Sequence, residues 1–207
     1  MNFWSKLLGR HRAIVSESNN LTFEQKLAIL AECGLVLDPQ FSVDDLLTSW
    51  SREDYESPGF NLVLVGLGMT EEQPPWRPHS ANVWHFDTEC IEDHGSYVDI
   101  AERMKAIAQG SLPIENLADY VDVEEGKAWL EFDVHGQRRH IDCKVDDDWV
   151  DVNLFKHFVD LLATSDPSKT FVYYDLQGQD CIIACVTKSQ LAALNKSGVA
   201  FERLRWS

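Results

Sequence analysis

Five ionisable residues lie close together between positions 87 and 94, and their spacing permits two kinds of chemistry. Asp87 and Glu89 are separated by one residue at the end of an apolar and aromatic run, and Glu92, Asp93 and His94 follow. In an extended strand, residues i and i+2 point to the same face, so the first two carboxylates could hold one divalent cation such as Mg²⁺. Alternatively, the whole group belongs to an acidic surface that attracts a basic partner.

The arrangement of Asp87 and Glu89 at the end of a strand resembles the first motif of the DEDD exonucleases. That resemblance implies that both carboxylates are metal ligands in a metal-dependent hydrolase or nuclease. The closing motif of the family places a His or Tyr four or five residues before an Asp, whereas His157 lies only three residues before Asp160. A divalent-metal-dependent hydrolase or nuclease is therefore kept as the alternative interpretation.

A second acidic segment has the sequence VDDDWVD and contains Asp146, Asp147, Asp148, Trp149 and Asp151. It lies between a predicted strand and a predicted helix, where Asp is favoured as an N-cap and is stabilised by the helix dipole. One Asp is enough for a cap, and four neighbouring carboxylates repel one another unless water, a cation or a basic partner meets them. The segment lacks the Gly and the distal Glu of an EF-hand loop, so a calcium site is not predicted. Helix capping, partner docking and metal binding all stay open as its role.

The net charge of the chain is strongly negative and unevenly distributed. The formal charge is −16, and residues 83–151 alone contribute −12 of it. Such a field repels nucleic acid and attracts basic surfaces or cations, although solubility is an equally simple explanation. The hydrophobic fraction of 44% and charged fraction of 25% are typical of a globular protein. No apolar run approaches the roughly 18 residues of a membrane helix, so neither a nucleic acid nor a membrane is expected as a partner.

The cysteines and the absence of cofactor motifs limit the chemistry further. The chain has five cysteines, Cys33, Cys90, Cys143, Cys181 and Cys185, without any C-x-x-C pair. An odd, unpaired set of this kind indicates reduced thiols in the cytoplasm rather than a disulfide framework or a zinc site. There is no G-x-S-x-G motif, no phosphate-binding loop and no complete dinucleotide fingerprint, so no cofactor is predicted.

The first part of the chain is predicted to be mainly helical. Residues 3–12 are basic and predict a helix, and Thr22 with Gln25 and Ser42 with Asp45 have the spacing of capping boxes. The apolar run that follows is typical of a buried strand, and three prolines then indicate a linker. The predicted organisation is a mainly helical portion at 1–72 with one strand at Phe60–Met69, a Pro-rich linker at 73–81 and an α+β domain at 82–207.

After the linker, helical periodicity alternates with hairpin patterns. The continuous apolar run 181–186 predicts a central strand, and the hairpins predict a largely antiparallel sheet with helices on one face, which is an α+β fold. The predicted elements are a strand at 82–87, a helix at 97–108, a short helix after Pro113, a hairpin at 128–145 turning at His135-Gly136, a helix at 154–162, a hairpin at 170–186 around Gly178, a helix at 187–197 and a strand at 199–206.

A small acidic α+β protein without a recognisable active site resembles, at the level of class, the immunity proteins of bacterial polymorphic-toxin systems. That resemblance implies a cytoplasmic inhibitor that binds a basic toxin domain, with a few aromatic residues supplying most of the affinity. Trp149 and Trp129 are candidate anchors, whereas Trp84 is expected in the core. The candidate partner-binding residues are Asp146, Asp147, Asp148, Trp149, Asp151, Glu89, Glu92, Asp93 and Trp129.

Overall fold

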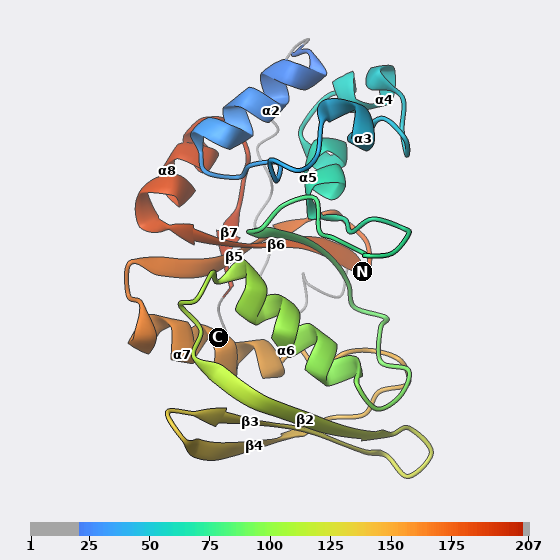
Figure 1. Ribbon diagram of the computed structural model, residues 1–207, viewed down its shortest axis with the longest axis vertical. Coiled ribbons are helices and arrows are strands. Elements are labelled where there is room, and N and C mark those ends of the chain that lie inside the picture. Colours follow the sequence, from blue (N-terminus) through green and yellow to red (C-terminus); the bar gives the residue numbers. More distant parts are fainter. Residues whose placement is uncertain (1–20, 205–207) are drawn as a thin grey trace.

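The computed structural model describes residues 21–204, which form four stacked layers (Figure 1). Helices cover one face of a four-stranded sheet, two further helices cover its other face, and a three-stranded sheet closes the stack. The helices are α2 (Phe23–Glu32), α3 (Val43–Leu46), α4 (Arg52–Glu56), α5 (Asn61–Gly68), α6 (Ser96–Ile107), α7 (Leu154–Ser165) and α8 (Lys188–Lys196). The strands are β1 (Val83–Asp87), β2 (Ile114–Asp122), β3 (Lys127–Val134), β4 (Gln137–Cys143), β5 (Lys169–Asp175), β6 (Asp180–Thr187) and β7 (Glu202–Arg203).

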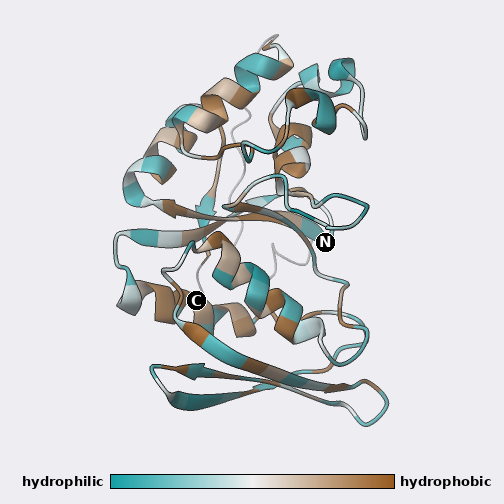
Figure 2. Cartoon of the chain, viewed as in Figure 1, coloured by the Kyte–Doolittle hydropathy of each residue, from teal (hydrophilic) through white to brown (hydrophobic). Residues whose placement is uncertain are grey.

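The four-stranded sheet is the centre of the molecule. Its order is β1-β6-β5-β7, and all its neighbouring strands are antiparallel. Strand β6 is buried on both faces, which confirms the prediction of a central strand. The strands of this sheet are mostly hydrophobic, whereas hydrophilic residues are more frequent in the outermost layers (Figure 2).

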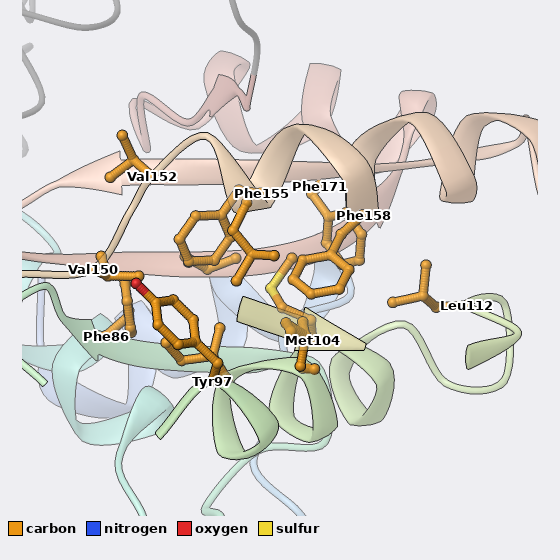
Figure 3. Close-up of a cluster of buried hydrophobic side chains, with 14 of the residues drawn as sticks. Phe86, Tyr97, Met104, Leu112, Val150, Val152, Phe155, Phe158 and Phe171 are labelled. Carbon is orange, nitrogen blue, oxygen red and sulfur yellow. The ribbon is translucent and has the colours of Figure 1, made fainter. Parts of the chain in front are cut away.

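Two hydrophobic cores lie on opposite faces of this sheet. The first is formed with α6, α7 and the inner face of the sheet β2-β3-β4, and aromatic side chains from several elements converge in it (Figure 3). The ring centroids of Phe86 and Phe155 are 5.4 Å apart, and those of Phe155 and Phe158 are 6.4 Å apart. The second core is formed with α2, α5 and α8. Helices therefore cover both faces of the central sheet and the strands form two sheets, so the prediction of helices on one face was wrong.

The predicted strand at Phe60–Met69 was also wrong, because this segment contains helix α5. Its side chains are apolar around most of the helix, and Val63, Leu64 and Leu67 are buried. A helix that is buried on nearly all sides has no polar face, so its sequence lacks the periodicity that distinguishes a helix from a buried strand.

The predicted short helix after Pro113 is strand β2. The structure shows a register shift between Glu115 and Ala118, and Asn116 has a positive φ of 50°. This bulge puts Ile114 and Val121, which are seven residues apart, into the same core. The apolar spacing of the sequence therefore imitates a helix.

The other helices and hairpins predicted within residues 21–204 are confirmed, and the α+β class with antiparallel sheets is confirmed with them. Thr22 and Thr187 accept hydrogen bonds from the N3 backbone N–H groups of α2 and α8 in complete capping boxes. The Pro-rich segment folds back as a loop in which Thr70 pairs with Pro78. The basic helix predicted at 3–12 lies outside the described residues.

Candidate acidic docking site

The structure brings the two acidic segments of the sequence side by side. Glu89 pairs with Trp149 in an isolated antiparallel bridge, and the Ile91 N–H donates to the Asp148 carbonyl at 2.9 Å. The Val150 N–H donates to the Thr88 carbonyl, also at 2.9 Å. Residues 87–93 and 146–151 thus form one surface, here named the acidic ladder.

Backbone alternation explains why this ladder presents its carboxylates to solvent. Thr88, Ile91 and Val150 point inward and are at most 3% exposed. Asp87 and Glu89, on either side of Thr88, are exposed, whereas Cys90 is half-buried against the first core. The short paired segment therefore anchors an apolar inner side while it displays charge on its outer side.

The start of α6 fixes one end of the ladder. The N-cap residue of α6 is Gly95, which has a φ of +100°. Because glycine has no side chain, the N-cap residue cannot itself accept a hydrogen bond from the first turn of α6. Asp119 of β2 supplies the cap, because its carboxylate accepts from the N–H groups of Gly95, Tyr97 and Val98 at 2.7, 2.9 and 3.1 Å. The three-stranded sheet thereby holds the segment that carries Glu92 and Asp93.

Asp87 and Glu89 converge as the sequence spacing predicts, but they converge on an amide. The Gln179 Nε2 donates to both oxygens of Asp87 at 3.2 and 3.3 Å and to Glu89 Oε2 at 2.9 Å. Within residues 21–204, no group of three or more His, Cys, Asp or Glu side chains is placed to hold a metal ion. No sequence signal singled out Gln179, because it lies in the β5–β6 turn, far along the chain.

The aspartates of the second segment have different roles. Asp151 accepts from the Lys144 N–H at 2.9 Å and from the Asn153 N–H at 3.0 Å, so it orders the turn that leads into α7. Asp146 pairs with Lys144 Nζ at 2.6 Å. Asp147 and Asp148 are exposed. The prediction that one of these aspartates caps the helix was wrong, because the N-cap of α7 is Asn153, whose side chain makes no capping hydrogen bond. Asp151 instead orders the preceding turn, and the other three aspartates are presented to solvent.

The three tryptophans singled out in the sequence lie in different environments. Trp149 is half-buried within the ladder, next to exposed Asp148. Trp84 is half-buried against the first core, with its ring centroid 4.5 Å from that of Phe86. Trp129 lies on the outer face of the three-stranded sheet, 6.1 Å from the ring of Tyr120. The candidate residues thus fall on two surfaces, the ladder and this sheet face.

Cys90 lies inside the ladder but is a poor nucleophile. Burial raises the pKa of its thiol to about 12, and the negative charges of Asp87, Asp148 and Glu92 add to that effect. A thiol in this state stays protonated near neutral pH, and only the thiolate is a good nucleophile. All five cysteines are free thiols.

A hollow of about 490 Å³ between β1 and α6 adjoins the ladder, and sequence reasoning missed its basic residue. Arg103 lines it together with Asp87, Glu92 and Asp99. The Arg103 Nη2 donates to the Val83 carbonyl at 2.7 Å, and burial lowers the pKa of its guanidinium to about 10. Arg103 therefore fastens α6 to the first residue of β1.

Comparison of the chain with family models, with curated proteins and with solved structures gave no match. In the part of the chain that the structure describes, no helix is long and apolar enough to cross a membrane. The fold and the site thus define an α+β protein with a concentrated acidic surface.

Proposed function

We propose that the protein is a cytoplasmic binding protein that docks a basic protein partner on the acidic ladder, and more specifically an immunity protein that inhibits a toxin domain. The observation that supports this most directly is the pairing of the two acidic segments. It concentrates eight carboxylates on one surface, those of Asp87, Glu89, Glu92, Asp93, Asp146, Asp147, Asp148 and Asp151.

Electrostatics and packing contribute in different ways to such docking. Carboxylates on one surface attract a basic partner over a distance and so accelerate association. Exposed charges give less to the final affinity, which usually depends on a few aromatic or arginine residues that become buried. Trp149 is suited to that second role, because it is half-buried at the centre of the ladder.

The alternative, a metal-dependent hydrolase, has less support from the geometry. Asp87 and Glu89 supply two carboxylates, but the third group at their meeting point is the amide of Gln179, whose nitrogen is a donor and not a ligand. Calorimetry with Mg²⁺ and Mn²⁺ tests this alternative. Micromolar binding that Asp87→Asn abolishes would favour the hydrolase over the docking proposal.

The docking proposal is tested by association kinetics with the partner, recovered from the source cells by crosslinking and then purified. Asp146→Asn combined with Asp147→Asn is expected to slow association several-fold at low salt. The effect should shrink as salt rises, because exposed charges are screened beyond about 8 Å at physiological ionic strength. Asn suits position 147 because it tolerates the positive φ of 57° found there.

A matched control removes the same charge elsewhere. Glu32→Gln combined with Glu53→Gln neutralises two exposed carboxylates of the N-terminal helices, across the central sheet from α6. This control should leave the association rate nearly unchanged. Equal effects of the two double variants, or a rate independent of salt, would contradict docking at the ladder. A partner whose toxicity is not inhibited by the protein would contradict the immunity role.

A further inference from the structure

Four aromatic rings form a row across the outer face of the three-stranded sheet. The ring centroids of His94 and Tyr120 are 4.8 Å apart, those of Tyr120 and Trp129 6.1 Å, and those of Trp129 and His140 5.5 Å. The rings come from the loop before α6 and from β2, β3 and β4 in turn, so the row crosses every strand of the sheet. It is named the ring row below.

The strand alternation turns the rings of Tyr120, Trp129 and His140 away from the core, whereas His94 comes from the loop before α6. In β3, the neighbours of Trp129 are Ala128 and Leu130, which are buried in the first core with exposed fractions of 6% and 0%. Trp129 therefore points outward, from the outermost layer of the molecule (Figure 1). A single surface ring is common, whereas a contiguous row of rings is a candidate interaction surface.

The row is bordered by carboxylates and adjoins a hollow. Asp142 lies directly opposite Trp129 in the β3–β4 register, and its side chain is 92% exposed. Tyr120, Trp129 and Asp142 line a hollow of about 430 Å³, which is within the usual range for a small-molecule or side-chain pocket. Lys127 also lines the hollow, but its ammonium is paired with Glu125 at 2.7 Å.

The ring row is continuous with the acidic ladder. His94 contacts Tyr120 in the row and pairs with Asp93 of the ladder, with 3.1 Å between His94 Nδ1 and the Asp93 carboxylate. A partner attracted by the ladder would therefore meet the ring row on the same side of the protein.

We infer that the ring row is a docking site for arginine side chains of the basic partner. This inference rests on the proposed function and specifies the chemistry of the partner. A guanidinium stacks on an aromatic face and donates hydrogen bonds to a carboxylate. Trp129 supplies the aromatic face, and an arginine would compete with the His140 imidazole for the carboxylate of Asp142. An ammonium is a compact, strongly hydrated charge and uses such a planar surface less well. A nucleic acid strand also stacks on aromatic rows, but the negative field of residues 83–151 opposes it.

The test uses nuclear magnetic resonance with two capped dipeptides, one of two arginines and one of two lysines. The arginine dipeptide is expected to shift the Trp129 indole N–H and the Tyr120 ring signals, and to bind several-fold more tightly than the lysine dipeptide. Trp129→Ala should weaken its binding about tenfold. Asp142→Asn should weaken it as well, and this exposed position tests the site without a large change in the core.

The control variant is Trp76→Ala, which removes a ring that is 61% exposed in the Pro-rich loop. It should not change arginine binding. The inference would be overturned if the two dipeptides bound equally well, or if the arginine dipeptide shifted the Trp76 signals as much as those of Trp129. It would also be overturned if a neutral oligosaccharide shifted the ring-row signals and the arginine dipeptide did not. Because no partner is needed, failure here leaves the salt-dependent kinetics of the ladder as a separate test of the proposed function.

Discussion

At the scale of single residues, Lys26 is unusual because it is only 1% exposed although it carries a charge. Its Nζ donates to the carbonyls of Tyr55 at 2.8 Å and Ser57 at 2.5 Å, at the end of α4. Burial lowers the pKa of this ammonium, which shows that desolvation outweighs the attraction of Glu56. Lys26 thus connects α2 to α4 through two backbone carbonyls.

We expect Lys26→Met to destabilise the protein by about 1–3 kcal/mol, because the buried Tyr55 carbonyl and the part-buried Ser57 carbonyl lose their donor. Urea denaturation measures the change in the free energy of unfolding. Lys156→Met, at an exposed position of α7, is the matched control and should have little effect. Equal stabilities of the two variants would show that the Lys26 hydrogen bonds contribute nothing net.

His140 has a raised pKa, and the cause is local. Glu131 Oε1 is 2.8 Å from its Nδ1, and Asp142 Oδ1 is 3.1 Å from its Nε2. The hydrogen bond with Glu131 is the larger cause and that with Asp142 the second, and both favour the charged imidazolium. Because the pKa is higher in the folded state, the stabilisation is fully present below the ordinary value of 6.5 and is lost as the pH rises through the folded-state pKa.

A titration of His140 followed by nuclear magnetic resonance should therefore give a midpoint above 6.5. Glu131→Gln should lower that midpoint, because it removes the main stabiliser of the charged form. Glu115→Gln, at an exposed position of the same sheet, should leave it unchanged. A midpoint that is insensitive to Glu131→Gln would mean that this ion pair does not form in solution.

At the scale of elements, the contact between α5 and β1 depends on Gly68. A Cβ atom at this position would lie 2.4 Å from the His85 backbone nitrogen and 2.9 Å from the Trp84 carbonyl carbon. Backbone atoms in a sheet cannot move aside easily. Gly68 therefore sets how closely α5 approaches the edge of the central sheet.

We expect Gly68→Ala to lower the melting temperature clearly, although Ala is the better helix former. Gly66→Ala is the comparison on the same helix, because its Cβ would meet the Tyr55 side chain, nearest at the hydroxyl oxygen at 2.8 Å. A side-chain end yields more easily than backbone, so Gly66→Ala should cost less. Calorimetry of both variants checks this order, and the reverse order would contradict the packing described.

Local sequence signals predict the elements of this fold where one side of an element is polar. The β3–β4 hairpin alternates clearly, and α2 and α8 have capping boxes, so these elements were predicted correctly. Helix α5 has no polar side, and in β2 the bulge replaces strand alternation by helix-like spacing. Both errors concern the spacing of apolar residues on which such predictions depend. Burial on nearly all sides removes the helical spacing from α5, and the bulge disturbs the strand spacing of β2.

At the scale of the whole molecule, the two cores share one sheet, and this should make unfolding cooperative. Val172 of β5 and Ile182, Ala184 and Val186 of β6 belong to the same core as Phe23, in α2. The N-terminal helices therefore cover apolar residues from the C-terminal half. A chain that begins at Gln73 would expose this surface to water.

We expect such a truncated chain to lose its sharp thermal transition and to bind hydrophobic dyes. The full chain should unfold in one transition that is the same by fluorescence and by circular dichroism. A soluble truncated chain with a sharp transition would instead support an independent domain at 82–207.

The acidic ladder also belongs to the scale of the whole molecule, which explains why the sequence predicts only its parts. Both acidic segments are evident from composition, and Asp87 and Glu89 do converge. The two acidic segments lie in the connections from β1 to α6 and from β4 to α7, and only the complete fold brings these connections together. Gln179 and the ring row carry no local signal, because their partners come from other strands.

The alternating burial of β6 also has an evolutionary consequence. Cys181, Ile183 and Cys185 belong to the first core, whereas their neighbours along the strand belong to the second. Among relatives of this chain, substitutions at these three positions should covary with substitutions of the buried residues in α6 and α7. Substitutions at positions 182, 184 and 186 should covary with those of the buried residues in α2, α5 and α8. Adjacent codons of β6 would then evolve with different cores. Insertion of a single codon within β6 would exchange the residues that face the two cores, so it should be among the least tolerated changes in the gene.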